Sequence, residues 1–160
     1  MIAVSILSYS SSTSSGMSEE AQYVRDFASE GRGCLQESTT LGLGSGVFEE
    51  LDAIAEECSQ PDWDGYGALP VTMDAVLNAH RFLEALPLGT PAPSAGAEPD
   101  GHVTLEWHVS PRRTFSVSIS PEGDLYFSGL FGPKRMSGAE PFFDEIPARI
   151  LDLIHRVFGE

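Results

Sequence analysis

Three short segments in the second half of the chain alternate apolar and polar residues, and this pattern constrains the fold more than any other feature. They are HVTLEWHV (102–109), TFSVSIS (114–120) and DLYFSGLF (124–131). A period of two places successive side chains on opposite faces of a strand. The apolar row of the first segment comprises Val103, Leu105, Trp107 and Val109. The short connections SPRR and PEG therefore predict an antiparallel meander of three strands, with a weak fourth near 134–137.

Helical spacing of apolar residues marks the segments on both sides of this meander. It predicts helices that begin near Ser18, Ser45 and Thr72, three residue types that cap helix N-termini well. A last helix is expected to open at Asp144, with Pro147 in its first turn. The predicted class is α+β: a helical N-terminal half, an antiparallel meander of three to four strands, and a C-terminal helix packed on the sheet.

The chain of 160 residues has the length of one domain. Residues 1–17 are expected to be a flexible Ser-rich N-terminus, and 18–160 a single α+β domain. Within that domain we expect helices over 18–87, a Pro/Gly/Ala linker over 88–101, and the sheet plus the last helix over 102–159.

The charge restricts the partners. There are 24 acidic residues against 9 basic ones, and residues 19–64 hold twelve of the acids. Such a surface repels phosphate backbones, so we expect no direct nucleic-acid binding and instead a protein partner with a basic surface. No apolar run is long enough to span a membrane, and Cys34 and Cys58 lack metal-ligand spacing, which favours a cytoplasmic protein without a cofactor.

The stretch PDWDGYGALP, residues 61–70, is expected to form a rigid corner between two helices. Its glycines can adopt positive φ, and Asp62 and Asp64 can accept hydrogen bonds from backbone amides. Trp63 and Tyr66 can wedge the corner against the core or serve as exposed binding anchors. A calcium loop would need a third acid and a distal glutamate, which are missing, so no metal is predicted here.

Two motifs resemble a widespread set of uncharacterised small bacterial and mobile-element proteins. These proteins share a WDGYGA corner, found here at 63–68, and a PDGxxxLEW strand, found here within EPDGHVTLEWH at 98–108. The likeness covers roughly 47–158. It implies a phage or mobile-element setting, in which small acidic proteins often act as antitoxins or defence inhibitors.

The leading hypothesis from the sequence is a non-enzymatic module that neutralises a basic partner: an antitoxin, an immunity protein or a phage anti-defence inhibitor. No catalytic motif such as G-x-S-x-G or a P-loop is present, so the sequence favours binding and leaves enzyme activity undecided. The expected contact residues are Glu49, Glu50, Asp52, Glu56, Glu57, Trp63 and Tyr66.

Two alternatives remain open. A metal-independent, nuclease-like toxin could use Glu106 and His108 for proton transfer and Arg112 or Arg113 to stabilise a phosphorane. The same strand offers His102, Glu106 and His108 as a possible metal set, or simply the solvated face of an amphipathic strand. The other alternative is a homo-oligomeric structural component of a phage or mobile element.

Overall fold

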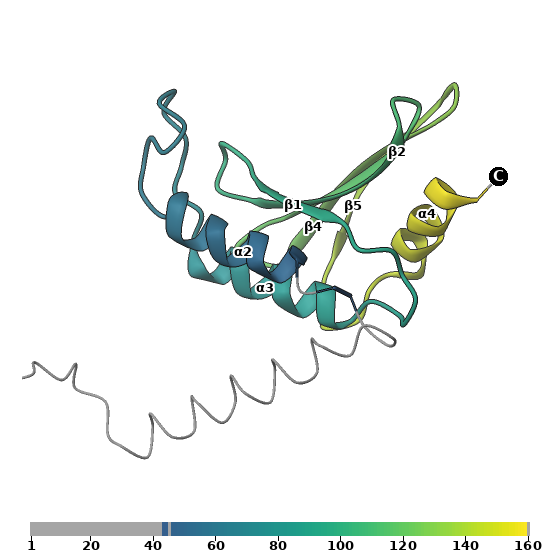
Figure 1. Cartoon of the computed structure of the whole chain (residues 1–160), viewed down its shortest axis with the longest axis horizontal. Coiled ribbons are helices and arrows are strands. Elements are labelled where there is room, and N and C mark those ends of the chain that lie inside the picture. The colour runs from purple at the N-terminus through teal and green to yellow at the C-terminus, as the bar shows by residue number, and fades with distance from the viewer. Residues whose placement is uncertain (1–42, 45, 160) are drawn as a thin grey trace, which may run out of the picture. The chain divides into compact units, whose positions relative to one another are not determined.

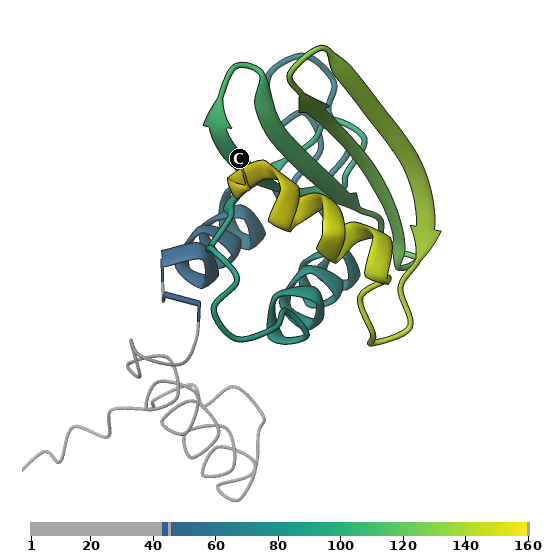
Figure 2. The ribbon, with the colours of Figure 1, turned by 90° about the vertical axis from the view of Figure 1, so that its right-hand side faces the viewer.

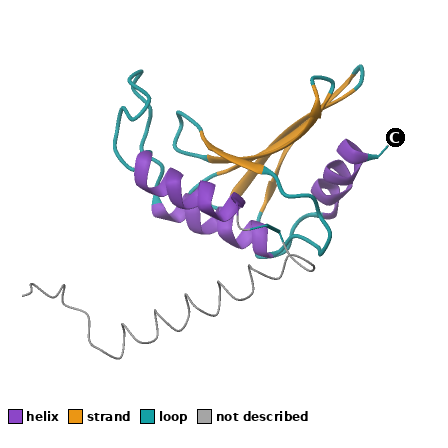
Figure 3. Ribbon diagram, viewed as in Figure 1, coloured by secondary structure: helices purple, strands orange, loops and turns teal. Residues whose placement is uncertain are grey.

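A five-stranded antiparallel sheet forms the centre of the fold in the computed structural model, which describes residues 43–44 and 46–159. All of these residues belong to the unit Gln36–Glu160. The strands neighbour one another in chain order, and Figures 1 and 3 show them gathered in one sheet. They are β1 (Ser94–Ala97), β2 (Val103–Ser110), β3 (Arg113–Ile119), β4 (Asp124–Phe131) and β5 (Lys134–Pro141). The predicted α+β class with an antiparallel meander is confirmed, but the sheet has five strands rather than three or four.

The described residues contain three helices: α2 (Gly46–Glu57), α3 (Met73–Glu84) and α4 (Ala148–Phe158). The Thr72 hydroxyl accepts a hydrogen bond from the Ala75 amide at 3.4 Å, so the predicted cap of α3 is confirmed. The predicted helical N-terminal half is matched here by α2 and α3 alone. The predicted features of residues 1–17 and 18–30, and the Ser45 cap, lie outside the described residues.

All three helices lie on one face of the sheet. Figure 1 shows the sheet nearly edge-on with the helices on the same side, and Figure 2 shows α4 crossing the strands. Alternate residues of the three central strands are buried against this layer, each contributing about 1.5–3 kcal/mol if fully buried. They are Val103, Leu105, Trp107, Phe115, Val117, Ile119, Leu125, Phe127 and Phe131. The expected packing of the last helix on the apolar face is confirmed.

The segment predicted as a linker, residues 88–101, is tied down along its length, and part of it forms β1. The Trp107 indole N–H donates to the Pro91 carbonyl at 2.8 Å, and β1 pairs with β2 over its four residues. Further along, the Leu69 amide donates to the Pro99 carbonyl at 2.8 Å. Composition indicated a spacer, but these contacts come from residues distant in sequence, which local composition does not report.

The alternation in β2 fails at its end. Val109 was expected in the apolar row, but it is exposed, because the pairing of β2 with β3 shifts register between His108 and Ser110. An irregularity of this kind adds a residue to one strand and turns later side chains out of the alternation.

The last helix begins later than predicted. Asp144 adopts φ 61, which a right-handed helix does not allow, and Pro147 occupies the N-cap with φ −55 and ψ 132. The proline is therefore the boundary of α4 rather than a member of its first turn. Among the described helices, which contain 11 or 12 residues each, none has the length or apolar content to cross a bilayer.

Candidate functional site

The corner between α2 and α3, residues 61–70, is built by its own aspartates. Asp64 Oδ1 accepts hydrogen bonds from the amides of Tyr66 at 2.8 Å and Ala68 at 3.1 Å. Asp62 Oδ1 accepts from the Gly67 amide at 2.7 Å. The rigid-corner prediction is confirmed in these bonds, and both carboxylates are engaged with the corner's own backbone.

The two aromatic residues of the corner have different environments. Trp63 packs against the core, and its indole N–H donates to the Leu69 carbonyl at 2.9 Å. The wedge interpretation is confirmed for Trp63. It is wrong for Tyr66, which lies in the turn between Gly65 and Gly67, both of positive φ, and is 94% exposed. Of the two proposed anchors, Tyr66 alone presents a full ring to solvent.

The acidic residues of α2 lie opposite its buried stripe. Val47, Leu51 and Ile54 face the core, whereas all five predicted contact acids of this helix are exposed. With about 100° per residue, the spacing i, i+3, i+7 places Glu49, Asp52 and Glu56 in one row. The solvent side of α2 is therefore a continuous acidic stripe, made of Glu49, Asp52, Glu56 and Glu57.

Glu50 and Asp52 also make contacts within the fold. Glu50 Oε2 accepts a hydrogen bond from the Ala95 amide at 2.6 Å, which joins α2 to the edge strand β1. Asp52 Oδ1 lies 3.9 Å from His80 Nε2, although its side chain is 78% exposed. Glu50 therefore serves the fold itself, and it is the one predicted contact acid with a backbone partner in the described part of the chain.

The face of the sheet away from the helices is polar. His102, Thr104, Glu106 and His108 lie on this face, as the alternation predicts. A row of aligned residues crosses the strands from Glu106 through Ser116, Ser128 and Ser137. The two central hydroxyls of this row are 3.1 Å apart.

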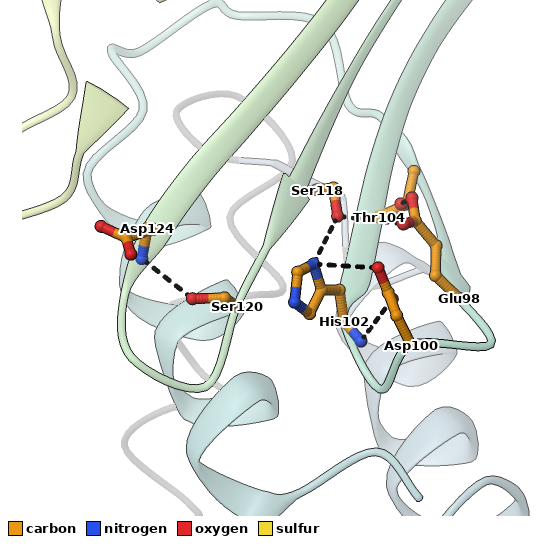
Figure 4. Close-up of polar contacts among 7 residues, drawn as sticks. All are labelled: Glu98, Asp100, His102, Thr104, Ser118, Ser120 and Asp124. Atoms are coloured by element: carbon orange, nitrogen blue, oxygen red, sulfur yellow. Dashed lines mark hydrogen bonds and ion pairs between the residues drawn. The ribbon is translucent and has the colours of Figure 1, made fainter. Parts of the chain in front are cut away.

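A denser polar cluster lies at the hairpin that joins β1 to β2 (Figure 4). Ser118 Oγ donates to Glu98 Oε2 at 3.1 Å and lies 3.1 Å from His102 Nδ1. The Thr104 hydroxyl donates to the other oxygen of Glu98. Asp100 Oδ2 lies 3.5 Å from the same imidazole nitrogen. A hydroxyl has one hydrogen, which Ser118 gives to Glu98, so its contact with His102 is a hydrogen bond only when Nδ1 of the imidazole carries a proton.

This hairpin is docked onto the corner. Gly101 has φ 87, and a Cβ at this position would lie 3.0 Å from the Pro70 carbonyl oxygen and 3.6 Å from Leu69 Cβ. This close approach of Gly101 to Pro70, together with the Leu69–Pro99 hydrogen bond, holds the hairpin against the end of the corner, before α3 begins. The WDGYGA and PDGxxxLEW motifs are thus neighbours in the fold.

Of the residues of the nuclease alternative, Glu106 and His108 lie together, whereas Arg112 and Arg113 lie elsewhere. His108 Nδ1 lies 3.8 Å from Glu106 Oε1, and both side chains are about half exposed on the open face. Arg113 has the same parity as the buried Phe115, so it lies on the helix side of the sheet, and Arg112 lies in the turn.

The alternative metal set on β2 is too extended to chelate one ion. At about 3.3 Å per residue, His102 and Glu106 are about 13 Å apart along the strand, and His108 is farther still. A different set of possible ligands lies in the EPDGH hairpin, residues 98–102, which was not among the predicted sites; there Glu98, Asp100 and His102 alternate around a turn. Their spacing, combined with turn-forming Pro99 and Gly101, was the available signal.

No protein family, curated protein or solved structure matches this chain.

Proposed function

We propose that this protein is a non-enzymatic binding module that recognises a basic surface of another protein through the acidic stripe of α2, with Tyr66 as an adjoining aromatic contact. The proposed role is that of a cytoplasmic antitoxin, immunity protein or anti-defence inhibitor. The phage or mobile-element setting of this role comes from the resemblance of the WDGYGA and PDGxxxLEW motifs.

The observation that carries the proposal is that some acids of α2 lie where they do not stabilise the helix. Glu56 and Glu57 occupy the last turn of α2, which contains no basic residue. The negative end of the helix dipole makes each acid unfavourable there by about 0.3–1 kcal/mol. Asp52 adds like-charge repulsion with Glu56 at i, i+4, worth about 0.2–0.5 kcal/mol. A positively charged partner would remove these penalties on binding.

Two further features support an interface at this end of the molecule. Aromatic residues are preferred anchors in protein interfaces, and the Tyr66 ring is almost fully exposed. A shallow pocket of about 300 Å³ lies between the end of α2 and the start of α3. Its lining includes Pro70, Val71 and the exposed Met73. An apolar side chain of a partner could therefore pack into this pocket beside the acidic stripe.

The test separates stability from recognition. The double variant Glu56→Gln/Glu57→Gln should unfold at the same or a higher urea concentration than the wild-type protein, since both charges oppose the helix dipole. A partner captured from the native host and identified by mass spectrometry should bind this variant at least about tenfold more weakly. A matched control, Glu122→Gln/Glu145→Gln, removes two exposed acids outside the helices and should bind normally.

Charge reversal sharpens the result. The triple variant Glu49→Lys/Asp52→Lys/Glu56→Lys should abolish binding, and binding of the wild-type protein should weaken as the salt concentration rises. Equal partner affinity in the wild-type and reversed proteins would refute the proposed surface. Tyr66→Ala should weaken binding without affecting stability, because its side chain projects into solvent.

The two alternatives each have a direct assay. If the protein is a nuclease-like toxin, purified protein should cleave cellular RNA, and Glu106→Gln should stop it. If it is a homo-oligomeric structural component, light scattering after size exclusion should show large assemblies. Either result would replace the binding proposal.

A further inference from the structure

Beyond the proposed function, and with different residues, we propose that the EPDGH hairpin, residues 98–102, is a binding site for a divalent transition-metal ion. Its ligands would be a carboxylate oxygen of Glu98, a carboxylate oxygen of Asp100 and Nδ1 of His102. One donor atom from each of these residues lies within 4.8 Å of the others. An imidazole and two carboxylates form a mixed donor set of the kind that binds zinc and its neighbours in the first transition row.

The backbone brings these three residues together before any ion arrives. The Glu98 amide donates to the His102 carbonyl at 2.9 Å, and the Gly101 amide donates to the Glu98 carbonyl at 2.9 Å. Directly paired residues of a hairpin point to the same face, so Glu98 and His102 share the open side of the sheet. Asp100 lies in the turn between them, and its Oδ1 accepts the His102 amide at 3.2 Å, which directs its second oxygen toward the imidazole.

The spacing of one donor pair, Asp100 and His102, fits bonds to one metal ion. Asp100 Oδ2 and His102 Nδ1 are 3.5 Å apart, and Figure 4 shows Asp100 and Ser118 approaching the same imidazole nitrogen. If an ion formed bonds of about 2.1 Å to both atoms, the angle between the two bonds would be about 110°, which is close to the tetrahedral value. Three protein ligands would leave a coordination position for water or for a group of another molecule.

Neighbouring side chains would support the ligands. Ser118 and Thr104 donate hydroxyl hydrogens to Glu98, and such contacts orient a ligating carboxylate. The imidazole ring of His102 stacks on Tyr126, with centroids 5.7 Å apart and an interplanar angle of 15°. A metal ion would replace the proton on Nδ1 of His102, so the ring would exchange its Ser118 hydrogen bond for the metal bond.

Isothermal titration with Zn²⁺ and the visible absorption of bound Co²⁺ test the site in the full chain carrying Cys34→Ser, which removes a competing thiol. We expect one Zn²⁺ per chain. Asp100→Asn and His102→Gln should each lower the affinity by about 100-fold or more, and Ser118→Ala by about tenfold, as typical for residues that orient a ligand. The double variant Glu106→Gln/His108→Gln is the matched control, because it removes a His–carboxylate pair from the same face, and it should bind normally.

Circular dichroism confirms that each variant is folded before titration. The site is refuted if Zn²⁺ and Co²⁺ do not bind the parent chain, or if Asp100→Asn and His102→Gln bind as it does. Binding of Mg²⁺ or Ca²⁺ in preference to Zn²⁺ would equally overturn the proposal, since those ions do not select imidazole. None of these outcomes depends on the acidic stripe, so the metal site and the proposed function stand or fall separately.

Discussion

Substitution of Gly101 by alanine should destabilise the protein because this residue sits at the contact between the EPDGH hairpin and the corner. Two costs combine. A non-glycine residue at φ 87 is strained by about 1–2 kcal/mol, and the added Cβ would lie 3.0 Å from the Pro70 carbonyl oxygen. Relieving such a contact with backbone typically costs about 1–3 kcal/mol. We therefore expect Gly101→Ala to lower the free energy of unfolding by about 2–5 kcal/mol.

Gly67→Ala provides a matched control within the corner. Gly67 has φ 90, nearly the value at Gly101, but nothing lies within 4 Å of the position its Cβ would take. This variant should show the conformational cost alone, about 1–2 kcal/mol. Urea unfolding followed by tryptophan fluorescence would measure both changes. If Gly101→Ala costs no more than Gly67→Ala, the docking of the hairpin on Pro70 does not contribute to stability and the reasoning fails.

Three further predictions concern the corner, the sheet and the free thiol. Asp64→Ala should lower the free energy of unfolding by about 1–2 kcal/mol, because two backbone amides lose their acceptor. Asp64→Asn keeps an acceptor oxygen and should lose less than half of that. Equal losses in the two variants would contradict the role of the hydrogen bonds. Gly138→Ala should destabilise by about 1–3 kcal/mol in chemical denaturation, because its Cβ would lie 2.6 Å from the Phe127 ring, and a stabilised variant would show that the ring moves freely. Burial, and to a smaller extent the neighbouring Glu57 charge, raise the pKa of the Cys58 thiol. In a Cys34→Ser background, iodoacetamide at pH 8 should therefore react with Cys58 about tenfold more slowly in the folded than in the unfolded protein. Equal reaction rates would show that the Cys58 thiol is not buried.

Local patterns predicted much of this fold. The alternation of apolar and polar residues in β2, β3 and β4 could be recognised in the sequence because one face of each strand is buried and the other is polar. The cap at Thr72 and the Asx contacts of the corner were also predictable, since they involve residues within five positions of one another. The edge strands were harder to predict. β1 is four residues of small side chains, and β5, whose outer edge pairs with none of the other strands that the structure describes, alternates less clearly.

The candidate sites likewise combine features that the sequence predicts with features that only the folded chain reveals. The acidic stripe followed from the period of α2, because the residues opposite Val47, Leu51 and Ile54 must face away from the core. The exposure of Tyr66 and the burial of Trp63 did not follow, since both are amphipathic and either could wedge the corner. Glu50 was likewise predicted to be a surface acid available to a partner. In the fold, β1 brings the Ala95 amide to its carboxylate.

The sequence by itself determined the class of the fold, the acidic side of α2 and the rigid corner, because each depends on the period or turn chemistry of a few neighbouring residues. Only the tertiary structure placed the EPDGH hairpin on Pro70 and gathered Ser118 from the next strand beside His102. Contacts between residues so far apart are decided by how strands pair and how loops close over the core. The proposed metal site therefore appeared only when the chain was folded.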